Sequence, residues 1–253
     1  MAEGQNINLL EKGFAVIELL SRSHCELGVS DISRRLKLVK SGAFRILNTL
    51  KDLDYVYQNP VTREYGLGIK FFFIGSSVQS KLPLCNLARQ YVEPLGQKWQ
   101  HSLSLSIPIF KAGEIPSFVV IYATAYGYSP LSIPGTYGPL HATATGKCLL
   151  AHMSESELQS VKGYPLQKYT DKTLTDWDSL YAQFKEIRYQ GLVRCQDEYH
   201  DGVTCYAVPV FDSMHSSIGA LSIAFDGETF AEDKLKNLVL DMKQACSRIG
   251  KAL

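Results

Sequence analysis

The stretch GPLHATATGKCLLA, residues 138–151, places a Gly-Lys pair behind an earlier glycine, with small residues between them. A phosphate-binding P-loop requires G-x-x-x-x-G-K-[ST], because its backbone amides wrap the phosphates and its hydroxyl reaches magnesium. Here His141 occupies the position of the first glycine, Cys148 replaces the hydroxyl residue, and seven residues separate Gly138 from Gly146. The stretch is therefore not a nucleotide-binding loop, and its role has to be inferred from the rest of the chain.

The chain has 253 residues, of which 45% are hydrophobic and 20% charged, and its formal net charge is +1. This is the composition of a soluble globular protein, long enough for one large domain or two smaller ones. No segment approaches about eighteen uncharged apolar residues, and the N-terminus lacks the regions of a signal peptide. We therefore expect a cytoplasmic protein without a global polyelectrolyte attraction to its partners.

The six cysteines are scattered, without a C-x-x-C pair. This pattern favours free thiols in a reducing compartment over a disulfide framework. Cys195, His200 and Cys205 could together approach a metal, but their spacing matches no zinc pattern, so pocket-lining thiols are the preferred interpretation. An enzyme with Cys148, Cys195 or Cys205 as nucleophile and His141 or His200 as base is a rival function. Nothing in the sequence sets a thiol beside a histidine and an orienting group.

Positive charge is concentrated in residues 31–51, DISRRLKLVKSGAFRILNTLK, where six basic side chains minus one aspartate give a local charge of +5. Apolar residues at helical spacing precede it, and the segment itself divides into two short helices joined by LVK. We expect Ser30 and Ser41 to cap these helices, because a serine oxygen accepts from amides of the first turn. Two short helices joined by a tight turn predict a helix-turn-helix.

The second of these helices presents residues suited to DNA. Arg45 can donate a fork of hydrogen bonds to guanine or phosphate, Asn48 can pair with adenine, and the small Gly42 permits a close approach to a groove. Residues 55–67 predict a β-hairpin wing with Arg63 near its tip. The residues expected to contact DNA are Lys40, Ser41, Gly42, Phe44, Arg45, Asn48 and Arg63. A domain of the same shape that binds protein is the alternative.

Residues 69–81, IKFFFIGSSVQSK, start apolar and turn polar, which predicts a helix leaving the DNA-binding domain. Residues 71–74 are too apolar to stay exposed, so we expect them to pack against a partner, preferably a second copy, or against the next domain. From residue 82 onward, helices and strands alternate, which predicts an antiparallel sheet flanked by helices, of α+β type. The expected helices are 84–100, 175–191 and 230–253, and the expected strands are 102–110, 117–126, 205–212 and 218–227.

Three stretches, in this order, resemble the IclR (isocitrate-lyase-regulator) family of bacterial transcription factors. The first is KSGAFRILNTLKDLDYV, residues 40–56, with the wing ending YGLG. The second is PLHATATGKCLLA, residues 139–151, very similar to the family signature P-L-H-A-T-A-x-G-K-A-x-L-A. The third is residues 191–225, which resemble the family's stretch around its glutamate, its G-V-x-C-x-A-x-P-V-F-D run and its closing S-I strand. The second and third are specific, and the resemblance covers about residues 9–253.

The resemblance implies an α/β (α+β) protein with a winged helix-turn-helix DNA-binding domain over residues 1–68 and a linker helix over 69–81. A GAF-like effector-binding domain with an antiparallel sheet would occupy residues 82–253, and the chain would assemble as a homodimer or a dimer of dimers (a homotetramer). The implied function is sequence-specific binding to double-stranded operator DNA, altered by a small organic acid effector. No cofactor, metal, membrane or catalytic residue is implied.

In the family, small residues at the start of a helix, here 141–153, touch the effector. Amides exposed at a helix start suit a carboxylate. The residues that the resemblance places at the effector are Leu131, Ala144, Thr145, Cys195, Cys205 and Ser222. Lys147 and His141 are expected to organise the loop rather than to act on a ligand.

The chain departs from the family at positions that matter for both sites. Cys195 stands where some members have aspartate, and Ala224 where some have a second serine, so hydrogen-bonding capacity is lost. A small keto acid, an aromatic or longer organic acid, and a pocket without a ligand all stay open. Gly42 replaces a threonine common early in the recognition helix. A sensor or interaction module that has lost DNA binding is therefore a second rival.

Overall fold

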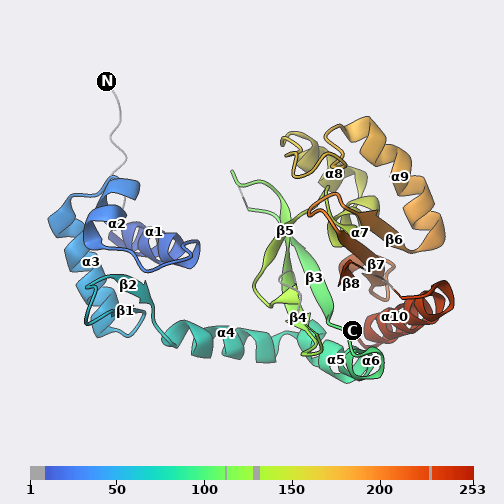
Figure 1. Cartoon of the computed structure of the whole chain (residues 1–253), viewed down its shortest axis with the longest axis horizontal. Coiled ribbons are helices and arrows are strands. Elements are labelled where there is room, and N and C mark those ends of the chain that lie inside the picture. Colours follow the sequence, from blue (N-terminus) through green and yellow to red (C-terminus); the bar gives the residue numbers. More distant parts are fainter. Residues whose placement is uncertain (1–8, 112, 128–131, 228–229) are drawn as a thin grey trace. The chain divides into compact units, whose positions relative to one another are not determined.

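The computed structural model describes residues 9–111, 113–127, 132–227 and 230–253. The chain divides into two compact units, Met1–Gln79 and Ser80–Leu253, and helix α4 (Lys70–Lys81) runs across the division (Figure 1). No helix in the described part of the chain combines the length and the hydropathy that crossing a membrane requires.

The N-terminal unit is a winged helix-turn-helix, as the sequence predicts. Its hairpin strands pair antiparallel with Tyr57 opposite Gly66, and an isolated bridge joins Leu27 to Tyr65. Apolar side chains from all its elements, such as Val16 and Leu47, form its core. Its elements are α1 (Leu9–Ser21), α2 (Val29–Arg35), α3 (Lys40–Asp52), β1 (Val56–Gln58) and β2 (Tyr65–Leu67).

The predicted serine caps are wrong. Helix α2 starts after Gly28 and α3 after Val39, and neither residue forms a side-chain cap hydrogen bond. Each supplies its backbone carbonyl instead: that of Gly28 accepts from the amide of Ile32 at 3.1 Å. Ser30 and Ser41 therefore lie inside the first turns, because the extended residue that starts each helix comes earlier in the chain than the pattern suggests.

The C-terminal unit is built on a six-stranded antiparallel sheet in the order β5-β4-β3-β8-β7-β6. The expected strands and the expected helices 175–191 and 230–253 are present to within a few residues. The strands are β3 (Leu103–Ile109), β4 (Ser117–Ala123), β5 (Tyr137–Pro139), β6 (Val193–Gln196), β7 (Val203–Phe211) and β8 (Ser217–Asp226). The helices are α5 (Pro83–Tyr91), α6 (Glu93–Trp99), α7 (Ala144–Ala151), α8 (Glu155–Lys162), α9 (Trp177–Gln190) and α10 (Glu232–Ala252).

Helices cover both faces of this sheet (Figure 1). Successive strand side chains point to opposite faces. Leu103 and Leu105 of β3 therefore join one core with α5, α6 and α10, whereas Val120 of β4 joins the other core with α7, α8 and α9. Ser104, between the two leucines, is buried and forms a hydrogen bond with Ser222 of β8. The sheet thus places small polar side chains in an otherwise apolar layer.

Two helices differ from their expected bounds. The segment 84–100 is not one bent helix: α5 ends at Tyr91 and α6 begins at Glu93, with Pro94 in the first turn of α6, where a missing amide is tolerated. Helix α7 begins at Ala144 rather than at 141, because extended Thr143 caps it by accepting from the amide of Gly146 at 3.0 Å.

Candidate functional site

Helix α7 carries the Gly-Lys pair and is buried along its whole length. It packs against β7 and α9, so its apolar residues are core residues on every side. Gly146 permits this packing: a Cβ at this position would lie 2.3 Å from the carbonyl oxygen of Leu140. The glycine is required for the close approach of two backbone segments, and not for a phosphate.

A small cavity of about 30 Å³ lies between the start of α7 and the sheet. Ala144, Thr145, Cys195, Cys205 and Ser222, which the sequence predicts at the effector, all line it; Leu131 lies outside the described residues. His200 and Ala224, which the sequence analysis named for other reasons, also line the cavity. The remaining lining residues are Ser104, Phe118, Ser132, Ala142, Thr143, Glu198, Tyr199, Val203 and Ile223.

Two thiols lie side by side on the cavity wall, because Cys195 of β6 is directly opposite Cys205 of β7. Burial raises the pKa of Cys205 to about 12. The pKa of Cys195 is also strongly raised, chiefly by burial and further by the nearby Glu198 carboxylate. Both thiols are therefore protonated at neutral pH and are poor nucleophiles and metal ligands. Among the described residues, no group of three or more His, Cys, Asp or Glu is arranged to hold a metal ion.

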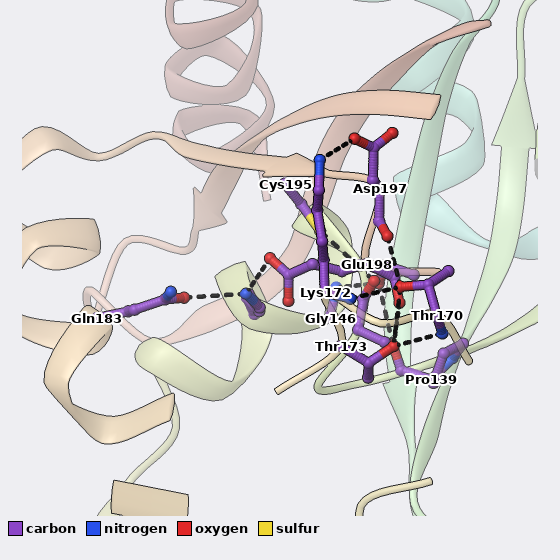
Figure 2. A network of polar contacts seen from close by, with 12 residues as sticks. Pro139, Gly146, Thr170, Lys172, Thr173, Gln183, Cys195, Asp197 and Glu198 are labelled. Carbon is purple, nitrogen blue, oxygen red and sulfur yellow. Dashed lines mark hydrogen bonds and ion pairs between the residues drawn. The ribbon is translucent and has the colours of Figure 1, made fainter. Parts of the chain in front are cut away.

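A buried ion pair stands at the edge of the cavity. The ammonium of Lys147, whose side chain is 1% exposed, donates to Glu198 Oε1 at 2.5 Å and to Gln183 of α9 at 3.0 Å. Figure 2 shows this chain of contacts from Gln183 to Glu198. Lys147 is not a lining residue of the cavity, whereas Glu198 is.

His141 holds a neighbouring loop. Its Nε2 forms a hydrogen bond with the carbonyl oxygen of Gln167 at 2.8 Å, and its ring packs against that of Tyr169. Burial lowers the pKa of His141, so its imidazole is neutral at neutral pH. These contacts fit a residue that organises the loop before α7.

The residues predicted to contact DNA gather on the exposed side of α3. Ser41, Phe44 and Arg45 are exposed and Asn48 is half-buried, whereas Ala43, Ile46 and Leu47 face the core. Lys40, at the start of α3, and Arg63 in the wing are also exposed. Gly42 is beside open space and, with Arg45, borders a groove between α3 and α1.

Glu26, which the sequence analysis did not single out, fixes the wing. Its carboxylate accepts from the Tyr57 hydroxyl at 2.5 Å and from the Asn59 amide at 2.8 Å. The hydrogen bond from Tyr57, followed by that from Asn59, holds the pKa of Glu26 below its usual value. Arg63 adopts a left-handed backbone conformation, with φ of 62°, in the turn that follows.

Comparisons with known proteins decide the family. The model of the bacterial transcriptional regulator IclR C-terminal domain matches residues 77–251, and the model of the IclR helix-turn-helix domain matches residues 9–60. The chain belongs to the IclR family.

This IclR-family chain is similar to curated regulators over nearly its whole length. It is 29% identical over 248 residues to the HTH-type transcriptional regulator KdgR of Escherichia coli (strain K12), covering 97% of this chain and 92% of KdgR. It is 30% identical over 232 residues to the HTH-type transcriptional repressor AllR of Salmonella typhimurium (strain LT2), covering 89% and 82%. It is thus related to transcriptional regulators that carry a DNA-binding helix-turn-helix and a C-terminal effector-binding domain.

One solved structure with the same fold as this IclR-family chain contains a bound ligand. The crystal structure of an IclR homologue from Microbacterium hydrocarbonoxydans complexed with 4-hydroxybenzoate superposes with a TM-score of 0.79. The match covers 97% of this chain and 99% of that one, at 20% identity. This likeness establishes the shared fold alone.

Proposed function

We propose that this IclR-family regulator binds operator DNA through the exposed side of α3 and the wing, and that a small organic carboxylate in the cavity beside α7 alters this binding. The regulator would act in the cytoplasm, with residues 1–68 binding DNA, 69–81 linking and 82–253 binding the effector. The observation that carries the proposal is the convergence of Ala144, Thr145, Cys195, Cys205 and Ser222 on one cavity.

The cavity offers a carboxylate hydrogen-bond donors rather than a cation. Ala144 and Thr145 are the first residues of α7, and amides of a first helical turn have no acceptor within the helix. The helix dipole favours negative charge at the same end. Among the described lining residues there is no lysine or arginine, so hydroxyls such as that of Ser222 would supply the remaining donors. The homologue that binds 4-hydroxybenzoate makes a carboxylate a reasonable ligand class for this fold.

Self-association is part of the proposal, as a dimer or a dimer of dimers. Apolar side chains of α1 and α3 line a groove of about 730 Å³ within the N-terminal unit. Leu9 and Phe14 beside it are exposed, as are Phe72 and Phe73 on α4. A second copy that covered these side chains would remove them from water. Two recognition helices could then read major-groove faces roughly 34–36 Å apart.

The rival enzyme would use Cys195 or Cys205 with His200, which line the same cavity, but the thiols are in the wrong protonation state for a nucleophile. Burial raises the pKa of Cys195 and of Cys205, and that of Cys148 rises strongly for the same reason. Curated relatives such as KdgR and AllR are regulators.

The DNA-binding half is tested by fluorescence anisotropy on the DNA upstream of the protein's own gene, against scrambled DNA at two salt concentrations. Selective binding that falls steeply with salt is expected, because phosphate contacts release counterions. Arg45→Ala should weaken specific binding by about 1–3 kcal/mol if Arg45 reads a base. Lys185→Ala, which removes an exposed cation from α9, should leave the affinity unchanged. If both variants bound the operator with the same affinity, Arg45 would not be one of the residues that read the bases.

The effector half is tested by Thr145→Trp, because an indole at this cavity-lining position would fill the cavity. The variant should bind operator DNA like the wild type but lose the response to a panel of small carboxylates. Thr145→Val, of nearly equal volume, controls for folding and should keep part of the response. A retained response in Thr145→Trp would place the effector elsewhere.

A further inference from the structure

Glu198, a residue that lines the cavity, has one buried oxygen without a partner. Glu198 lines the cavity with a side chain that is 12% exposed, and its Oε1 accepts from Lys147. Its other carboxylate oxygen, Oε2, is buried and has no hydrogen-bond partner within the described structure. Buried polar atoms nearly always have a partner, and one without a partner costs free energy that a bound donor recovers.

No strong donor satisfies this oxygen. The Glu198 carboxylate raises the pKa of the Cys195 thiol, after burial has done so, through its charge and through a side-chain hydrogen bond. A thiol is a weak donor, however, and that of Cys195 donates to the carbonyl oxygen of Ala142 at 3.5 Å. Lys147 donates to Oε1 and to Gln183, and it forms no hydrogen bond with Oε2.

The position of Glu198 is fixed by its backbone. Its carbonyl oxygen accepts from the Thr173 hydroxyl at 2.5 Å, and that of Asp197 accepts from the Thr170 hydroxyl at 2.6 Å. Asp197 has a left-handed φ of 58°, and its carboxylate pairs with Lys172 (Figure 2). Hydrogen bonds to two successive backbone carbonyls hold the Glu198 carboxylate in place before a ligand binds. The carboxylate is therefore preorganised for recognition.

Charge determines what kind of donor fits. Lys147 already balances the Glu198 carboxylate, so Oε2 needs a hydrogen-bond donor and not a second cation. A hydroxyl donates without adding charge. The ligand carboxylate would then face away from Glu198, toward the start of α7, because two carboxylates repel each other.

We infer that Glu198 determines effector specificity by accepting a hydrogen bond from a hydroxyl group, so that the cavity selects hydroxycarboxylates over the same acids without the hydroxyl. The inference rests on the proposed function, since it names the class of acid that the cavity beside α7 takes. The described walls leave about 30 Å³, so short acids require the least displacement of the cavity wall.

Matched acids that differ by one hydroxyl test the inference by calorimetry on the full-length protein. The pairs are lactate and propionate, 3-hydroxybutyrate and butyrate, and 4-hydroxybenzoate and benzoate, each titrated to millimolar concentration. Because a hydrogen bond to a charged group is stronger than a neutral one, the hydroxy acid of at least one pair should bind about 10-fold more tightly or better.

Two variants assign the preference to Glu198. The double variant Lys147→Met with Glu198→Leu replaces the buried ion pair by apolar side chains of similar size, which proteins often tolerate. It should fold and bind the two acids of the pair within about threefold of each other, because no acceptor is left. Glu198→Gln, which leaves Lys147 an amide oxygen, should reduce the preference. Glu155→Gln, at an exposed carboxylate on α8, should keep the wild-type ratio.

Each contrary result has a distinct meaning. Equal wild-type affinities within every pair would overturn the inference and leave the proposed carboxylate effector standing. A preference that persists in the folded double variant would also overturn it, as would tighter binding of alanine than of lactate. No binding of any acid, with operator binding unaffected, would overturn the proposed effector class together with the inference.

Discussion

The buried ammonium of Lys147 joins helix α9 to the turn that forms part of the cavity wall. Lys147 is 1% exposed, and its partner Glu198 comes from the turn between β6 and β7. Removing one member of such a pair leaves the other charge buried and uncompensated. The lysine of the Gly-Lys pair, which looks like a phosphate ligand in the sequence, is thus a structural counter-ion.

We therefore predict that Lys147→Met lowers the free energy of unfolding by about 3–5 kcal/mol. Trp99 and Trp177 both lie in the C-terminal unit, so tryptophan fluorescence in urea reports on that unit. Lys98→Met is the control, because Lys98 pairs with Asp241 at 2.6 Å but its side chain is 59% exposed. This change should lower the free energy of unfolding by at most about 1 kcal/mol. Equal effects of the two changes would contradict the structural role of Lys147.

At the scale of the element, α7 shows why a glycine can be required inside a helix. Alanine normally stabilises a helix interior relative to glycine by about 1 kcal/mol. At position 146, however, a Cβ would meet the Leu140 backbone at 2.3 Å, and backbone cannot rotate away as a side chain can. Sterics against a neighbouring segment should therefore outweigh helix propensity.

Gly146→Ala is accordingly expected to lower the melting temperature and to weaken effector binding, since the segment before α7 has to move. Gly163→Ala, after α8, is the matched control: its φ is −70° and a Cβ there would meet nothing within 4 Å. Differential scanning calorimetry measures the melting temperatures of both variants, and only that of Gly146→Ala should fall. If Gly146→Ala were as stable as the control, the close approach would not be the reason for the glycine.

At the scale of the whole molecule, the proposed self-association would cover apolar side chains that are exposed in the single chain. Leu9 and Phe14 of α1 face the groove beside α3, and Phe72 and Phe73 stay exposed on α4. A charge introduced there would have to be buried in the interface, which costs much more than exposing it.

We predict that Phe14→Asp shifts the protein toward the monomer in sedimentation velocity and weakens operator binding, because one monomer contacts only one half-site. Met214→Glu, at an exposed residue in the turn between β7 and β8, should leave the oligomeric state as it is. An unchanged sedimentation coefficient for Phe14→Asp would move the interface away from α1.

Most helices and strands of this protein could be predicted from patterns in its sequence. Helical spacing, the basic segment 31–51 and the wing residues identify the winged helix-turn-helix, and apolar alternation identifies most strands of the second domain. These patterns act between residues a few positions apart, so their order in the chain is sufficient. The predicted starts of α2 and α3 were wrong, because Gly28 and Val39 use backbone carbonyls where the sequence suggested serine oxygens.

The family resemblance named five residues that line the cavity, whereas the contacts that build its walls follow from strand pairing and packing. Ser104 meets Ser222 across 118 positions because β3 pairs with β8, and Cys195 meets Cys205 because β6 pairs with β7. The family resemblance covers the stretch that contains Glu198, but no pattern shows which of its oxygens Lys147 leaves without a donor. Contacts between distant residues arise from strand order and packing, and the satisfaction of one buried oxygen depends on every group around it.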